Sequence, residues 1–156
     1  MRSTIQILVS ALVALFLLAL PVAAADVGFD TAPLSVITAD GKTHNFTVEL
    51  ALDSEQRALG LMNRRDMAAD HGMLFDFGQT RQVLMWMKNT YLPLDMLFIL
   101  ADGKVATIRE NAVPLSEAII DSRVPVAFVL EVNAGTVKRL GLHEGDRVVA
   151  DRIKGK

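Results

Sequence analysis

Residues 85–109 read MWMKNTYLPLDMLFILADGKVATIR, and this stretch decides the predicted fold. Its second half holds two apolar-rich segments, Leu94–Leu100 and Lys104–Arg109, on either side of Asp102-Gly103. Glycine readily adopts the positive φ of a tight turn, so this pattern predicts a β-hairpin. The first half places polar residues in an apolar run, and buried polar atoms cost free energy unless they are paired. The residues expected either to stabilise the fold or to line a site are Trp86, Lys88, Asn89, Thr90 and Asp95.

Short strands dominate the rest of the chain. Leu34–Ala39 and Thr43–Leu50 flank Asp40-Gly41, which predicts a second hairpin. The other predicted elements are a helix capped by Asp53 or Ser54 and running to about Met62, strands over Met73–Phe77, Val83–Lys88, Val126–Val132 and Arg147–Ala150, and a short helix over Gly135–Leu140. About eight strands and two short helices predict an α+β class, a β-rich single domain with a bent, mostly antiparallel sheet or small barrel.

The first 25 residues have the layout of a secretory signal peptide. Arg2 gives a positive start, Ile5–Leu20 is almost wholly apolar, and small residues at Ala23 and Ala25 suit cleavage before Asp26. The apolar block is shorter than the ~20 residues that a membrane-spanning helix needs. We therefore expect a periplasmic or secreted protein with no stable membrane span after cleavage; the alternative is an uncleaved anchor.

The amino-acid composition argues against several classes of function. The chain has no cysteine, which excludes disulfides, thiolate metal sites and a cysteine nucleophile. Removal of residues 1–25 takes away only Arg2 among the charges, which leaves 15 basic and 18 acidic side chains in residues 26–156. No basic run of the kind that follows a phosphate backbone is present, so nucleic acid is not an expected partner. Without repeats or a linker, residues 26–156 are expected to form one domain.

Five ordered motifs carry a resemblance to a known family. They are Gly60-Leu61-Met62-x-Arg64, Gly72-Met73-Leu74-Phe75-x-Phe77, Trp86-Met87-Lys88-Asn89-Thr90, Pro93-Leu94-Asp95 and Leu130-Glu131-Val132-Asn133-Ala134-Gly135. Together they resemble the bacterial and archaeal family known as domain of unknown function 192, over about Leu34 to Ala150. One departure is Met85, where the family more often carries an aromatic residue. The resemblance implies a compact, β-rich and frequently exported domain, and it brings no established activity.

Strand alternation assigns faces around Trp86. Side chains of a strand point alternately to opposite faces, so Trp86 and Lys88 should share one face and Met85 and Met87 the other. Trp86 and Lys88 then form either a ligand wall with a charge for an anionic group, or a core tryptophan with a lysine stem beside it. Asn89 is expected to serve mainly as a turn residue.

Two acids fall on faces that are otherwise apolar. Asp95 is in phase with Leu97, and Glu131 is in phase with Val129 in the most β-like run. Buried carboxylates need partners, or their pKa values rise. The cations near the motifs are Arg57, Arg64 and Lys88.

These acids allow two interpretations. In the favoured one, Arg64 and Lys88 neutralise Asp95 and Glu131 in a buried ion-pair network that fixes the sheet. In the other, the acids face a cleft, and one with a raised pKa acts as general acid or base in the hydrolysis of an envelope polymer.

Gly60 lies inside the predicted first helix, where glycine costs about 1 kcal/mol relative to alanine. Such a position usually marks a close approach, to a neighbouring strand or to a ligand, and the strand is favoured.

Metal sites have little support in the sequence. Thioethers are soft ligands for Cu(I), and Met85 and Met87 have a suitable spacing, but methionine commonly fills irregular cores. The three histidines, His44, His71 and His143, lack zinc-site spacing. No metal and no cofactor is therefore expected.

The leading functional hypothesis is a noncatalytic binding or accessory module for a small anionic ligand or an envelope component. The alternative is a carboxylate-dependent hydrolase, so enzymatic activity is left undecided, and a flat, exposed Trp86 would favour a protein-interaction domain instead. The candidate ligand-binding residues are Arg64, Trp86, Lys88, Asn89, Thr90, Asp95 and Glu131.

Overall fold

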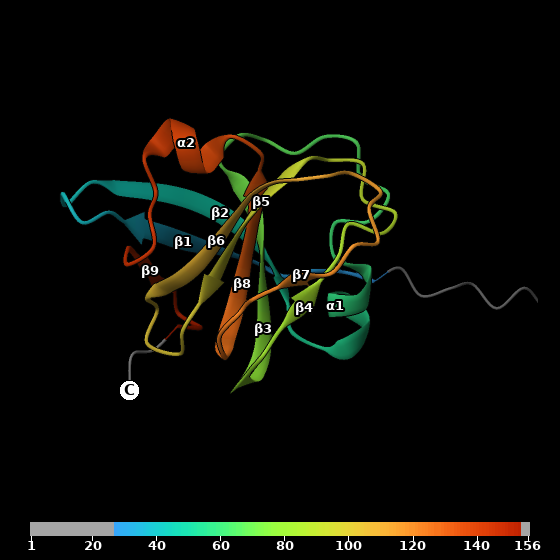
Figure 1. The fold of residues 1–156 in the computed structure, drawn as a ribbon, viewed down its shortest axis with the longest axis horizontal. Coiled ribbons are helices and arrows are strands. Elements are labelled where there is room, and N and C mark those ends of the chain that lie inside the picture. The colour runs from blue at the N-terminus through green and yellow to red at the C-terminus, as the bar shows by residue number, and fades with distance from the viewer. Residues whose placement is uncertain (1–26, 154–156) are drawn as a thin grey trace, which may run out of the picture.

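The computed structural model describes residues 27–153, and the predicted signal peptide lies outside this range. The described residues form a seven-stranded sheet in the order β6-β5-β8-β3-β2-β1-β9 and a two-stranded sheet of β4 and β7 (Figure 1). The elements are β1 (Thr31–Ile37), β2 (Thr43–Ala51), α1 (Ser54–Leu59), β3 (His71–Arg81), β4 (Leu84–Met85), β5 (Leu94–Ile99), β6 (Val105–Ala112), β7 (Ile120–Asp121), β8 (Val126–Asn133), α2 (Thr136–Leu140) and β9 (Arg147–Val149). The predicted α+β, β-rich class is confirmed. No helix within residues 27–153 is long and apolar enough to cross a membrane.

The large sheet is antiparallel except between β2 and β3. Parallel neighbours require a crossover connection, and residues 52–70 supply it and contain α1. The two edge strands approach each other at one end, where Lys104 forms an antiparallel bridge with Arg147 and the Val105 N–H donates to the Asp146 carbonyl over 2.8 Å. The sheet therefore curls into the half barrel seen in Figure 1.

Both predicted hairpins are confirmed, because their turns are encoded locally. Gly41 joins β1 to β2 with a φ of 83°, and Gly103 joins β5 to β6 with a φ of 90°. Gly103 is also constrained by its surroundings, since a Cβ there would lie 2.5 Å from the Val148 carbonyl oxygen of β9. This turn therefore lets the last strand pass close to the β5–β6 hairpin.

Helix α1 starts where the sequence predicts and ends earlier. The Asp53 side chain accepts a 2.8 Å hydrogen bond from the Gln56 N–H, and the Gln56 side chain accepts from the Asp53 N–H over 3.3 Å. This reciprocal capping satisfies backbone donors that a helix start leaves free. The helix stops at Leu59, because Gly60 leaves helical geometry with a φ of 49°.

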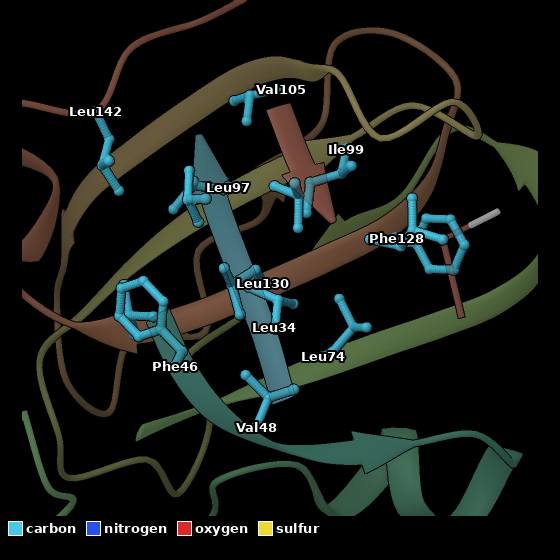
Figure 2. Close-up of a cluster of buried hydrophobic side chains, with 14 of the residues drawn as sticks. Leu34, Phe46, Val48, Leu74, Leu97, Ile99, Val105, Phe128, Leu130 and Leu142 are labelled. Carbon is cyan, nitrogen blue, oxygen red and sulfur yellow. The ribbon is translucent and has the colours of Figure 1, made fainter. Parts of the chain in front are cut away.

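The central strands supply residues to two hydrophobic clusters on opposite faces of the sheet. Leu74 and Leu130 belong to the first cluster, whereas their chain neighbours Met73 and Val129 belong to the second. Figure 2 shows the first cluster, in which side chains from β1 and β2 gather with those of the middle strands. The second cluster packs the other face of the sheet against the loops that follow α1 and β4.

The strand predicted over Val83–Lys88 is wrong in extent. Only Leu84 and Met85 form β4, and they pair with β7, which the sequence did not predict. Beyond Met85 the backbone bonds to a loop, since the Met87 N–H donates to the Ser116 carbonyl over 2.9 Å. Alternation therefore fails here, and Met85 and Trp86 line the same cavity, while Met87 is fully buried.

Candidate functional site

A cavity of about 370 Å³ lies where α1 and the chain after it meet β3, β4 and β8. The crossover supplies one side of the cavity, and the sheet supplies its floor. Its lining residues are Ser54, Arg57, Ala58, Leu59, Gly60, Leu61, Met62, Phe75, Phe77, Arg81, Leu84, Met85, Trp86, Thr90 and Glu131. Glu131 is the single carboxyl in this set, so the cavity combines one acid and two guanidinium groups with aromatic, aliphatic and thioether side chains.

Glu131 stands in the middle of the sheet on the face of the second cluster. It lies opposite Met73 of β3 and Met96 of β5, and both methionines are fully buried. Glu131 itself is 4% exposed, and none of residues 27–153 forms a hydrogen bond or an ion pair with its carboxyl. Burial raises the pKa of Glu131 to about 8, because removing a carboxylate from water disfavours its charged form.

Two arginines near Phe77 form a cationic part of the lining. The Arg57 guanidinium carbon lies 5.9 Å from the centroid of the Phe77 ring, and that of Arg81 lies 4.8 Å from it. Arg57 is fixed in place, because one guanidinium nitrogen donates to the Leu52 carbonyl and, over 2.9 Å, to the Asp76 carbonyl. Arg81 is exposed, so its guanidinium is the more accessible of the two for a ligand.

Gly60 brings the crossover close to β3. A Cβ at this position would lie 3.1 Å from the Phe75 ring, and the φ of 49° disfavours any side chain. The structure confirms the predicted close approach to a neighbouring strand, at a position just after the helix. Gly60 and Phe75 both line the cavity, so this contact also shapes the site.

The segment after β4 provides the remaining polar lining. Trp86 is 46% exposed, and the Lys88 Nζ atom lies 5.4 Å from its ring centroid, a cation–π distance. Thr90 is buried, and its hydroxyl donates to the Lys88 carbonyl over 3.1 Å. Asn89 has a φ of 52° and its carbonyl accepts from the Asn63 N–H over 2.8 Å, which makes it a turn residue outside the lining.

Asp95 lies on the opposite face from Glu131. The register pairs Asp95 with Val132 and Met96 with Glu131, so the two acids belong to different rows of the sheet. The Asp95 carboxylate is fully buried and accepts from the Asn111 N–H over 2.9 Å and the Val137 N–H over 3.0 Å. It therefore joins β6 to the first turn of α2, a structural role.

Arg64 also lies outside the cavity lining. Its guanidinium donates to both carboxylate oxygens of Glu49 over 2.5 Å, and its carbon lies 5.7 Å from the Phe29 ring centroid. The hydrogen bonds to Glu49 raise the pKa of Arg64. The predicted ion-pair network is therefore wrong: Arg64 is paired with Glu49, and backbone amides hold Asp95.

The structure thus brings Trp86, Thr90 and Glu131 together, with Lys88 stacked on Trp86, and separates Arg64, Asn89 and Asp95 from them. Sequence reasoning missed Arg81 and the aromatic residues of β3. Phe75 and Phe77 lie within the predicted strand, whereas Arg81 follows a register shift between β3 and β8 after Asp76, so alternation along the sequence could not place it. That the assembled residues bind a ligand stays a prediction.

The donor set does not suit a metal ion. Within residues 27–153 no three His, Asp or Glu side chains are arranged to hold one. Hard cations prefer several oxygen ligands, and the cavity offers a single carboxyl.

Comparison with known proteins identifies relatives of the same architecture. A protein from Sinorhizobium meliloti 1021, provisionally named a transcription regulator, is 67% identical, with a TM-score of 0.79 over 80% of this chain and 97% of that one. A protein of unknown function from Novosphingobium aromaticivorans DSM 12444 is 37% identical, with a TM-score of 0.75 over 83% of this chain and 89% of that one. No curated protein matches the chain.

The sequence also matches the model of the family described as DUF192, Uncharacterized ACR, over residues 35–150. This range contains every residue that lines the cavity. It also contains the five motifs and all strands of the large sheet from β2 onward. The chain therefore belongs to the DUF192 family.

Proposed function

We propose that this protein is a noncatalytic binding module for a small ligand with an anionic group, acting in the bacterial envelope or outside the cell. One observation carries the proposal: a cavity of about 370 Å³ presents two guanidinium groups beside an aromatic and thioether surface. A cavity of this size, which combines apolar side chains with a few placed polar groups, is typical of small-molecule sites.

The anionic group is expected at Arg57 and Arg81. Guanidinium groups form strong, directional hydrogen bonds with carboxylates and phosphates. Because both guanidinium groups lie near the Phe77 ring, an apolar part of the ligand can pack beside this ring while the charge meets the guanidinium groups. Trp86 then covers the ligand from the side of β4.

Trp86 makes the proposal directly testable, since it is the single tryptophan of the chain and lines the cavity. The protein without its predicted signal peptide, residues 26–156, is titrated with 3-phenylpropionate, hexanoate and glucose 6-phosphate at millimolar concentration. Trp86 fluorescence is recorded during each titration. We expect at least one anion to change the emission with saturation. Arg81→Gln should lower the affinity for that anion by about tenfold, the size expected for one charged hydrogen bond.

Arg147→Gln is the matched control, because Arg147 is exposed on β9 at the far edge of the sheet. It should leave the affinity unchanged. If none of the three anions alters Trp86 fluorescence, or if both arginine variants weaken binding equally, the proposed site is wrong.

A second candidate is the carboxylate-dependent hydrolase acting on an envelope polymer. The pKa of Glu131, raised to about 8, favours it, since a protonated acid at neutral pH can serve as a general acid. Polymer hydrolysis by two carboxylates requires a second acid in the same cleft, and the described lining contains only Glu131. The binding module is therefore preferred, and release of soluble sugars or peptides from purified cell-wall material would instead support the hydrolase.

The provisional name of the Sinorhizobium relative raises nucleic acid as a partner. The excess of acidic over basic side chains in residues 26–156 argues against it, because DNA binding depends on neutralising phosphates. Export remains part of the proposal and is supported by the apolar segment Ile5–Leu20. Detection of the cleaved protein in a periplasmic fraction tests it.

A further inference from the structure

Glu131 is an acid without a counter-charge. Its nearest neighbours across the sheet on the same face are Met73 and Met96, which are uncharged and fully buried. The other titratable groups in the described lining are Arg57 and Arg81. Within residues 27–153 no ion pair joins Glu131 to either guanidinium, and both guanidinium groups lie against Phe77. The cavity therefore presents two unpaired polar parts, a cationic end at Phe77 and an acidic end at Glu131.

The surface around the acid suits an organic cation. Phe75 supplies an aromatic ring to the same lining, and aromatic faces attract ammonium groups through their quadrupoles. Met62 and Met85 supply polarisable thioethers to the same lining. A carboxyl at the floor of such a cavity is the natural partner for a positively charged donor, because a buried acid without a partner is unfavourable.

We propose that the ligand is zwitterionic, with a protonated amine that binds Glu131 and an anionic group that binds Arg57 and Arg81. This inference rests on the proposed function and specifies its ligand class: amino acids and related small amino-acid-like molecules. The two ends of the cavity require opposite charges on the ligand, and the volume of about 370 Å³ admits a molecule of this size.

Amine binding has a measurable proton signature. With a pKa of about 8, roughly nine in ten Glu131 side chains carry a proton at pH 7. An ammonium group favours the ionised carboxylate, so binding should release close to one proton for each ligand. An anion that contacts only the arginines should release none.

Three matched probes separate the two ends of the site. Phenylalanine carries both charges, 3-phenylpropionate lacks the amine, and phenethylamine lacks the carboxylate. Affinities come from Trp86 fluorescence, and proton release comes from calorimetry in two buffers of different ionisation enthalpy. We expect phenylalanine to bind about tenfold or more tightly than either single-charge probe, with release of close to one proton.

Glu131→Gln should abolish the advantage of phenylalanine over 3-phenylpropionate. Glu110→Gln, an exposed acid of β6, is the control and should change nothing. The proton count needs only the unaltered protein, so it decides the matter even if Glu131→Gln folds poorly.

The outcomes distinguish the two proposals. If 3-phenylpropionate binds as tightly as phenylalanine and neither releases a proton, the zwitterion inference is overturned and the anion site stands. If phenethylamine alone binds with proton release, the acid site stands and the anion site is overturned. If no probe binds, both proposals are overturned.

Discussion

Asp95 and Glu131 are two buried acids on neighbouring strands with opposite surroundings. Asp95, on β5, faces one side of the sheet and accepts hydrogen bonds from two backbone N–H groups. Glu131, on β8, faces the other side and receives no hydrogen bond from the described residues. Both are almost inaccessible, at 0% and 4% exposure. The difference teaches that burial alone does not distinguish the two acids; the presence or absence of a hydrogen-bond partner does.

The largest expected effect is on the pH dependence of stability. The folded protein keeps a proton on Glu131 up to a pKa of about 8, whereas the unfolded chain releases it near the ordinary value of 4.5. The unfolded state therefore binds fewer protons between these values, and the free energy of unfolding should fall as pH rises from about 4.5 to 8. The full contribution is on the order of 5 kcal/mol. Urea unfolding at a series of pH values measures it.

Glu131→Gln isolates this contribution, because every other titrating group is the same in both proteins. The difference in stability should grow with pH in favour of the variant. Asp40, Asp70 and Asp121 have lowered pKa values, so their contributions are lost only below about pH 4 and fall outside the window. Parallel curves for the two proteins between pH 5 and 8 would contradict an unpaired acid.

Removal of Asp95, the acid with hydrogen-bond partners, should destabilise the protein, whereas Glu131→Gln should stabilise it. Asp95→Ala leaves the N–H groups of Asn111 and Val137 buried without an acceptor, which should destabilise the protein by about 3 kcal/mol at pH 7. Asp102→Ala is the control, since Asp102 also accepts from a backbone N–H, that of Lys104 over 3.0 Å, but lies in an exposed turn. Equal losses for the two variants in urea unfolding would show that burial of the Asp95 bonds is unimportant.

The smallest expected effect concerns Arg64, the cation first assigned to these acids. Arg64→Gln breaks the partly buried pair with Glu49 and should cost about 1 kcal/mol. It should leave the titration of Glu131 unchanged, as followed by carboxyl carbon chemical shifts. Lys42→Gln, at the exposed pair with Asp40, is the control and should have no measurable effect on stability. A shift in the pKa of Glu131 in the Arg64→Gln variant would support the ion-pair network predicted from the sequence.

Local sequence signals predicted the fold well. Asp40-Gly41 and Asp102-Gly103 specify their turns by glycine conformation, and Asp53 specifies the start of α1 by capping. The β4–β7 pair escaped prediction because it depends on contact between segments far apart in sequence. No short-range pattern in residues 84–85 identifies their partner.

The candidate site was only partly predicted, again because it depends on contacts between segments far apart in sequence. Alternation placed Asp95 and Glu131 on apolar faces, but only the register between β5 and β8 reveals that these faces are opposite. Arg64 is paired with Glu49, a residue of β2 to which the sequence analysis assigned no role. Residue types and strand phase are readable from sequence, whereas the choice of partner is a property of the assembled sheet.

The parallel pair β2–β3 has a consequence for how this family can diversify. Because the connection between these strands must cross over the sheet, residues 52–70 carry nearly half of the cavity lining while adding no strand to the sheet. Loops tolerate exchange better than the elements they join. Relatives could therefore acquire new ligands by rewriting this one segment, with Glu131 and the sheet retained as a constant platform beneath it.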